Sequence, residues 1–242
     1  RTIALATAGP LDIVGPVIGG RLLVKAEGAV SLTDPLNNVG TVTVDPPSSF
    51  TYIQDAALEI GAVNAQGVVG GSIAPIAVTS AATSRGDFFV QSRNGSITLT
   101  QGIATLDPGS GITLVAGTNF LNTGGAGLTP GSEGFWQVWA NTWVGESRGG
   151  LAPGNPLPNL YGCVYPACDI SGVTIEPGNH FLYTQRPAVD VIGGNFSRQV
   201  GEPNPPLTFT VSGLMAALGD TQDDAVVGAF STTATPSSGE GV

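Results

Sequence analysis

Residues 87–100 have the sequence DFFVQSRNGSITLT, and this stretch decides the fold. Apolar and polar residues alternate on each side of a central turn, as in strands with one buried face. The apolar positions are Phe88, Val90, Ile97 and Leu99. Asn94 and Gly95 lie between the strands, and we expect them to supply the positive φ angles of a short turn. The stretch therefore predicts strand, turn and strand.

The same pattern returns in residues 21–33 (RLLVKAEGAVSLT) and, shortened, in residues 111–117 (GITLVAG). A strand–turn–strand unit cannot bury its apolar face alone, so its copies are expected to stack into a solenoid. We therefore interpret residues 87–100 as one rung of a stack rather than as a hairpin. Aligning Val24 with Val90 gives a separation of 66 residues, which corresponds to three turns of about 22 residues.

The predicted fold is a right-handed parallel β-helix whose core consists of ladders of Val, Ile, Leu and Phe. The predicted inward positions are Leu22, Val24, Val30, Leu32, Phe88, Val90, Ile97, Leu99, Ile112 and Leu114. We expect β-helix rungs over residues 1–122 and an aromatic-rich end segment with a disulfide loop over residues 123–187. A smaller β unit is expected over residues 188–242.

Within the last two segments, the apolar runs predict several short strands. They cover residues 173–175, 181–183, 188–191, 207–211, 226–230 and 232–235. The best helical candidate is the short run 214–218. The chain of 242 residues contains 36 Gly and 18 Pro, so long helices are nearly excluded.

The formal net charge is −10, from 8 Lys and Arg against 18 Asp and Glu. Nucleic-acid binding needs clustered basic residues, which this sequence lacks. No apolar run reaches the roughly 18 residues that a membrane-spanning helix needs. We therefore expect no nucleic-acid partner and no membrane insertion. The sequence begins at Arg1 in the middle of its pattern, which indicates a segment of a longer protein.

Cys163 and Cys168 are the only cysteines and lie in GCVYPACD. Their spacing suits a small loop closed by a disulfide, which predicts an exported protein. The alternative is a pair of free thiols in a reducing cytoplasm. A structural zinc ion would need two further ligands, and the only histidine is His180.

An aromatic cluster, GFWQVWANTWVG, contains Phe135, Trp136, Trp139 and Trp143. One interpretation is a sugar-binding aromatic surface. The other is a wide end layer of the core, in which large rings fill a broadening cross-section. We favour the core layer, because no constellation of Asp, Asn or Arg closely accompanies the rings.

Several stretches resemble the filamentous haemagglutinin-like adhesins of bacterial two-partner secretion. FFVQSRNGSITLT and GTVTV…ALEIGAVNAQG are similar to their degenerate β-helix repeats, and GITLVAGTNFLNTGGAGL…FWQVWANTW…RGGL with NHFLYTQRP is similar to the end segment after the repeats. VGEPNPPLTFTVSGL…GDT…GAFSTTATPSSGEG resembles part of an MBG domain, with Val200-Gly201-Glu202 in place of the usual Tyr-Gly-Asp. The resemblance implies export to the cell surface, a role in adhesion, aggregation or extracellular matrix, and no catalytic residues.

Two further motifs suggest binding. Asp220, Asp223 and Asp224 lie close together in sequence and would suit calcium, but the spacing of known calcium loops is absent and solvated carboxylates explain the cluster.

Arg85-Gly86-Asp87 is an RGD tripeptide, which can engage integrins from an exposed turn in host-binding adhesins. The alternative is a chance match that begins a strand. We expect no catalytic residue, cofactor or bound metal.

Three functions fit these observations. The first is a non-enzymatic segment of a secreted bacterial adhesin that binds host or neighbouring cell-surface molecules. The second is an extracellular filament in which copies of the chain join head-to-tail through open β-helix ends. The third is a β-helix enzyme acting on carbohydrates, which needs paired carboxylates on one exposed face. The acidic residues of the first half fall mainly at turns, which argues against the enzyme.

Overall fold

The computed structural model describes the chain except for residues 70–71, 79–80, 155–156, 169–175, 227 and 240–242. It contains two compact units, Arg1–Gln185 and Arg186–Val242. Strands make up 41% of the chain and helices 3%, and parallel sheets form a β-helix of about seven turns. The predicted all-β solenoid is therefore confirmed. The strand predicted over 173–175 lies outside the described residues.

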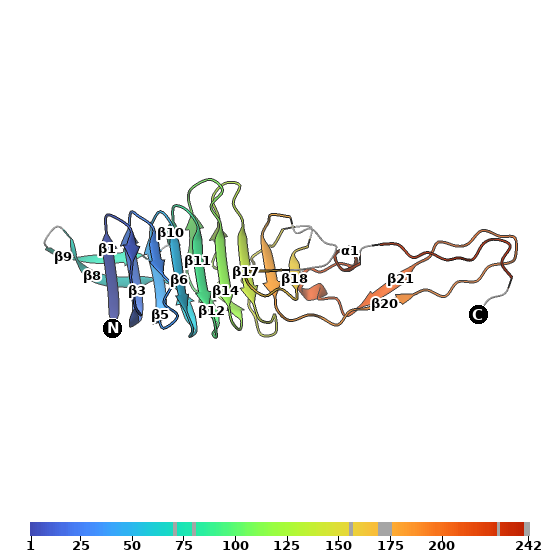
Figure 1. Ribbon diagram of the computed structural model, residues 1–242, viewed down its shortest axis with the longest axis horizontal. Helices are drawn as coiled ribbons and strands as arrows, with labels where there is room; N and C mark the ends of the chain where they lie inside the picture. The colour runs from blue at the N-terminus through green and yellow to red at the C-terminus, as the bar shows by residue number, and fades with distance from the viewer. Residues whose placement is uncertain (70–71, 79–80, 155–156, 169–175, 227, 240–242) are drawn as a thin grey trace. The chain divides into compact units, whose positions relative to one another are not determined.

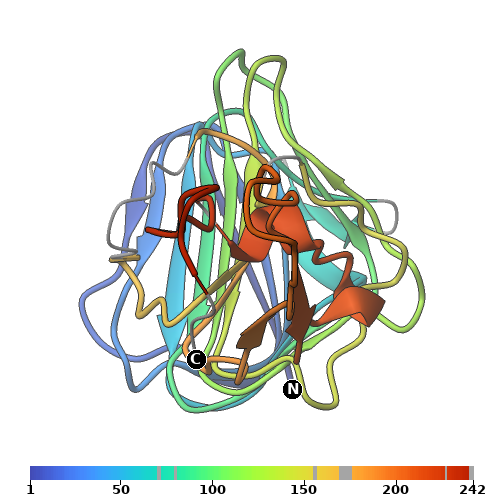
Figure 2. The same ribbon diagram turned by 90° about the vertical axis from the view of Figure 1, so that its right-hand side faces the viewer.

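Successive strands of the β-helix belong to three parallel sheets (Figure 1). The six-stranded sheet comprises β1 (Thr2–Thr7), β3 (Ile18–Ala26), β5 (Asn38–Asp45), β7 (Leu58–Ile60), β12 (Ile97–Leu99) and β15 (Phe120–Leu121). The eight-stranded sheet comprises β2 (Leu11–Asp12), β4 (Val30–Leu32), β6 (Phe50–Gln54), β11 (Phe88–Ser92), β14 (Ile112–Ala116), β17 (Trp136–Ala140), β19 (His180–Tyr183) and β18 (Asn159–Tyr161). The three-stranded sheet comprises β10 (Ala81–Ser84), β13 (Gly102–Thr105) and β16 (Leu128–Thr129). Figure 2 looks along the stack, where the rungs of the first unit superpose around a common centre.

Residues 87–100 belong to one rung and do not form a hairpin, as predicted. Strand β11 pairs in parallel with β6 and β14, and β12 pairs in parallel with β7 and β15. The two strands of the stretch therefore belong to different sheets and bond to neighbouring rungs rather than to each other. Each rung supplies backbone hydrogen bonds to the rungs on both sides, so the stack is continuous through this stretch.

The core consists of the predicted apolar ladders. All ten inward positions named from the sequence are at most 1% exposed, which confirms the alternation argument. Phe50 and Phe88 lie in register on neighbouring strands with their ring centroids 5.2 Å apart. Ile112 and Trp136 continue this ladder on β14 and β17. Burial of such side chains is the main source of the stack's stability.

The corner of the rung differs from the predicted turn. Neither Asn94 nor Gly95 has a positive φ. Gly95 is instead required by close packing, because a Cβ there would lie 2.2 Å from the Ala57 nitrogen of the neighbouring rung. The Asn94 N–H donates to the Asp55 carbonyl at 2.9 Å, which bonds the corner to that rung. The prediction of positive φ was wrong because it treated the corner as an isolated turn.

The alignment of Val24 with Val90 was also wrong. Val24 lies on β3 of the six-stranded sheet, whereas Val90 lies on β11 of the eight-stranded sheet. The in-register partner of Val24 is Val44, 20 residues later, and that of Val90 is Leu114, 24 residues later. The predicted number of residues per turn was therefore nearly right. The assignment of strands to sheets was wrong, because the strands of every sheet show the same alternation of apolar and polar residues.

An inserted hairpin explains part of this error. Strands β8 (Val63–Val69) and β9 (Ser72–Val78) pair antiparallel, and Figure 1 shows them running across the direction of the rung strands. Val63 and Leu23 form a small buried cluster where the hairpin meets the outer face of the six-stranded sheet. The insertion lengthens one turn, so counting residues through it misplaces every later strand.

The second unit is a small β structure. Strands β20 (Asp190–Gly193) and β21 (Phe209–Ser212) pair antiparallel, followed by a 3₁₀ helix at Ala216–Leu218 and α1 (Gln222–Ala225). The two strands are close to those predicted over 188–191 and 207–211. None of the described residues of this unit is buried. An isolated two-stranded sheet is marginally stable, so this unit has little core of its own.

The strands predicted over 226–230 and 232–235 were wrong for the residues that the structure describes there. At the end of the second range, side chains donate hydrogen bonds to backbone carbonyls that a neighbouring strand would otherwise use. The Arg198 guanidinium donates to the carbonyls of Thr235 and Pro236, and the Asn204 amide donates to the Ala234 carbonyl at 2.6 Å. The predicted short helix over 214–218 is confirmed as the 3₁₀ turn.

Candidate functional site

Aromatic rings gather where the β-helix reaches its last strands. Strand β17 alternates so that Trp136 faces the core and Trp139 faces outward, and both are buried. The Trp136 ring meets the Phe181 ring of β19 edge-on, with 5.1 Å between centroids. Phe135, directly before β17, is half-buried. These rings therefore pack into the protein on both faces of one strand.

The loop after β17 adds further rings to the inner layer. Trp143 meets Tyr161 and Tyr183 edge-on, with centroids 5.3 Å and 5.7 Å apart. Tyr161 and Tyr183 stack on each other across the β18–β19 pair. We call the rings of Trp136, Trp143, Tyr161, Phe181 and Tyr183 the aromatic end layer.

A buried ion pair lies against the aromatic end layer. Arg148 Nε donates to Glu146 Oε1 at 2.7 Å, and the two side chains are only 14% and 4% exposed. Arg148 also donates to Asn159 Oδ1 at 2.6 Å and to the Tyr183 hydroxyl at 2.5 Å. That hydroxyl donates in turn to the Glu146 carboxylate at 2.8 Å. We call these four residues the Glu146 network.

The network is both electrostatic and aromatic. The Arg148 guanidinium carbon lies 4.0 Å from the centroid of the Phe181 ring, which adds a cation–π contact. Burial raises the pKa of the Tyr183 hydroxyl well above its ordinary value, with Glu146 adding to the rise and Arg148 opposing it. Tyr183 therefore remains a neutral donor to Glu146 at physiological pH. The arrangement holds the end layer together through charges that are paired and hydrogen-bonded.

The argument that no polar constellation accompanies the rings was wrong. Glu146 and Arg148 follow Trp143 closely in sequence, but Tyr183 comes 35 residues after Arg148 and joins them only through the coiling of the chain. Only 11% of the residues are charged, so two opposite charges beside an aromatic cluster were a usable signal. Because the network is buried within the protein, it supports a core layer rather than an open sugar-binding platform.

The RGD tripeptide forms a corner of the stack. Arg85 and Asp87 are exposed, and the backbone N–H groups of Arg85 and Gly86 donate to the Pro47 and Ser48 carbonyls of the neighbouring rung. Asp87 Oδ1 accepts a hydrogen bond from the Gly111 N–H at 2.8 Å. A receptor-binding RGD loop must present both its arginine and its carboxylate freely, whereas here the backbone is bonded to the neighbouring rung and the carboxylate is engaged by Gly111.

The predicted disulfide between Cys163 and Cys168 is confirmed. It closes a loop that packs on the outer face of the eight-stranded sheet, where the Tyr165 ring lies 5.3 Å from the Trp139 ring. Disulfides persist in oxidising surroundings, so this bond indicates a non-reducing environment. No described helix has the length and apolar character needed to cross a membrane.

Comparison with known proteins found no matching family model, no similar curated protein and no similar solved structure.

The resemblance to filamentous haemagglutinin-like adhesins and to the MBG domain therefore stays a prediction from the sequence. The observations that bear on function are the fold itself, the corners hydrogen-bonded to neighbouring rungs, the disulfide and the Glu146 network.

The acidic cluster of the second unit has a local structural role. Thr221 and Asp224 form a capping box at the start of α1, in which Asp224 Oδ2 accepts from the Thr221 N–H at 2.9 Å and from its hydroxyl at 2.6 Å. Among the described residues, no group of three His, Cys, Asp or Glu side chains could hold a metal ion. The structure does not bring Asp220, Asp223 and Asp224 together as a metal site.

His180 was the only histidine available for acid–base chemistry. Its ring is buried, with Nδ1 2.9 Å from the Leu157 carbonyl oxygen and Nε2 3.0 Å from the Glu176 carbonyl oxygen. Both ring nitrogens therefore face backbone carbonyls, an arrangement that fixes the ring between two loops.

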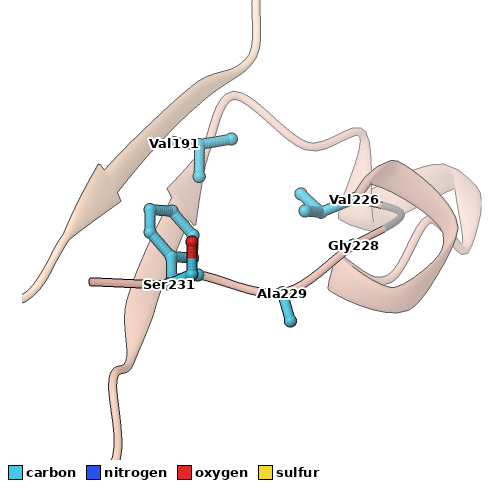
Figure 3. A pocket seen from close by; sticks show the side chains of 6 residues that line it. Val191, Val226, Gly228, Ala229 and Ser231 are labelled. Carbon is cyan, nitrogen blue, oxygen red and sulfur yellow. The ribbon is translucent and has the colours of Figure 1, made fainter. Parts of the chain in front are cut away.

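The second unit contains a shallow apolar pocket (Figure 3). It is lined by Val191, Val226, Gly228, Ala229, Phe230 and Ser231. The Phe230 ring also lies 4.9 Å from the Phe209 ring of β21. The lining offers one hydroxyl and no charged side chain, so it has little means of orienting a polar ligand.

Proposed function

We propose that this chain is a non-enzymatic segment of a secreted bacterial cell-surface adhesin. The observation that carries the proposal is the continuous parallel β-helix of about seven turns, which presents its side chains on a regular outer surface. The corners are bonded to neighbouring rungs, as Arg85 and Asn94 are, so the surface is held in a fixed shape. A surface of this kind spreads many weak contacts over a large area, which suits adhesion or aggregation.

Two further observations support export and a structural role. The Cys163–Cys168 disulfide is stable outside a reducing cytoplasm. The side chains of Glu146 and Arg148, only 4% and 14% exposed, are paired with each other against the aromatic end layer. The resemblance in sequence to filamentous haemagglutinin-like adhesins supports the same proposal.

Attachment of coated beads to cells tests the proposal. Beads carrying the folded, oxidised chain are expected to attach to epithelial cells or to aggregate bacteria at least about threefold more than albumin-coated beads, because each bead engages many copies. Attachment no greater than that of albumin beads contradicts the proposal. The alternative function is an extracellular filament of copies joined head-to-tail. Electron microscopy of the same preparation distinguishes it, because regular filaments would support a self-assembling structural subunit.

Substitution of Arg85 by Ala tests whether the RGD tripeptide takes part. We expect attachment of the Arg85→Ala chain to equal that of the unsubstituted chain, because the tripeptide is bonded into a corner and Asp87 is already engaged by Gly111. Circular dichroism serves as the folding control, since the exposed Arg85 side chain contributes little to stability. A loss of most attachment, with the fold retained, would show that the tripeptide is a receptor site.

A further inference from the structure

An apolar ladder runs along the outer face of the eight-stranded sheet. Val115, Trp139 and Leu182 lie in register on β14, β17 and β19, and Leu160 of β18 is in register with Leu182. Their neighbours Leu114, Val138 and Phe181 point into the core, so these four point away from it. All four are nevertheless at most 6% exposed. Because these outward side chains are buried, another segment of the chain must cover this part of the sheet.

The disulfide loop supplies part of that cover. The Tyr165 ring lies 5.3 Å from the Trp139 ring and 5.6 Å from the Phe89 ring, and both cysteines pack in the same cluster. The ring therefore contacts outward aromatic residues of β17 and β11, the two strands on either side of β14. Val164 of the same loop is 61% exposed, so the loop has one side on the ladder and one side in water.

The loop is held to the rungs mainly through Cys163. The Cys163 N–H donates to the Tyr183 carbonyl at 2.9 Å, and the Thr184 hydroxyl donates to the Cys163 carbonyl at 3.1 Å. Beyond Cys163, the hydrogen bonds described for residues 164–168 join only Val164 and Ala167 to each other. The disulfide is the covalent link that returns Cys168 to the anchored Cys163.

The cover also leaves one polar group without a partner. Trp139 Nε1 is buried and makes no hydrogen bond within the described part of the chain. A buried unsatisfied donor opposes the closed arrangement, because opening would return the N–H to water. The aromatic contacts of Tyr165 and the closure of the loop by the disulfide must outweigh this penalty.

We propose that the Cys163–Cys168 loop is a reduction-sensitive cover over this outer apolar ladder. A dithiol reductant transfers two electrons to the disulfide. The S–S bond breaks, each cysteine sulfur takes up a proton, and the reductant becomes its own disulfide. The opened loop regains conformational freedom, so the Tyr165 ring leaves Trp139 and Phe89. The rungs stay folded, because the inner apolar ladders and the parallel strand pairing of β14, β17 and β19 do not depend on the disulfide.

Hydroxyl-radical footprinting with mass spectrometry tests this, because it reads Trp139 and Trp136 separately in one sample. After reduction with dithiothreitol and anaerobic desalting, oxidation of Trp139 is expected to rise about fivefold while that of core Trp136 stays unchanged. The Cys163→Ser/Cys168→Ser chain is expected to show the raised Trp139 oxidation without reductant and no response to it.

A third variant tests the cover with the disulfide intact. Tyr165→Ala is expected to raise Trp139 oxidation in the oxidised chain, because the ring itself is removed. Two outcomes overturn the proposal. One is unchanged Trp139 oxidation when alkylation shows both thiols to be free. The other is a parallel rise at Trp136, which would mean that reduction unfolds the β-helix rather than opening its cover.

Discussion

Replacing Arg148 by Met is expected to lower the free energy of unfolding by about 3–5 kcal/mol, because the buried Glu146 carboxylate loses its cation. The carboxylate is 4% exposed and cannot recover its hydration without opening the aromatic end layer. The Asn159 oxygen and the Tyr183 hydroxyl also lose a charged donor. Urea denaturation followed by far-ultraviolet circular dichroism measures the change.

Lys25→Met is the matched control for this substitution. Lys25 and Asp45 form an ion pair at 3.0 Å whose side chains are 57% and 34% exposed. Such a surface pair contributes about 0–1 kcal/mol, so the control chain should unfold near the unsubstituted one. The double change Glu146→Gln/Arg148→Met should recover part of the loss, because no buried charge is left unpaired. Equal effects of Arg148→Met and Lys25→Met would contradict the role given to the Glu146 network.

Phe88→Ala is expected to lower the free energy of unfolding by about 3–5 kcal/mol, because it opens a cavity in the central ladder. Phe88 is 1% exposed and lies between Phe50 on β6 and Ile112 on β14. Neighbouring rungs are fixed by backbone hydrogen bonds, so they cannot collapse into the space. The same denaturation experiment measures the effect.

The adjacent residue supplies the control. Phe89 points to the outer face and is half-buried against Tyr165. Phe89→Ala is expected to cost less than about 1.5 kcal/mol, because less apolar area returns to water. A larger loss for Phe89→Ala than for Phe88→Ala would mean that the inward and outward faces of β11 have been exchanged.

Alternation was enough to predict the core. Phe88, Val90, Ile97 and Leu99 were placed inward because apolar residues recur at every second position on each side of the turn, and all four are buried. The recurrence of this strand–turn–strand pattern also predicted stacking into a solenoid. These features are local, so a single sequence contains them.

The sheet to which each strand belongs could not be predicted in the same way. Val24 and Val90 have similar surroundings in sequence but lie on different sheets, because every face of the β-helix requires the same alternation. The inserted hairpin β8–β9 then breaks the count of residues per turn. The sheet assignment depends on which strands pair between neighbouring rungs, and a short stretch of sequence does not specify that pairing.

The Glu146 network was missed for a related reason. Its members are Glu146, Arg148, Asn159 and Tyr183. The pairing of β18 with β19 places Asn159 and Tyr183 on adjacent strands, where Arg148 bonds both. The second unit was predicted less well beyond its two strands. At the end of the predicted strand over 232–235, Arg198 and Asn204 side chains bond the carbonyls of Thr235 and Ala234, which a neighbouring strand would otherwise use.

Engineered cysteine pairs test the stacked register most directly. Ser31 and Thr51 are in-register partners on β4 and β6, and Phe89 and Thr113 continue the same row on β11 and β14. Neighbouring strands lie about 4.8 Å apart, which a disulfide can bridge, whereas Ser31 and Thr113 are separated by about three such spacings. Mild oxidation followed by peptide mapping identifies the cross-links, apart from the native Cys163–Cys168 bond.

The account predicts that Ser31→Cys/Thr51→Cys forms its internal disulfide nearly completely and that Ser31→Cys/Thr113→Cys forms none. An absent cross-link in the first pair, or an efficient one in the second, would contradict the parallel β-helix on which the proposed function rests.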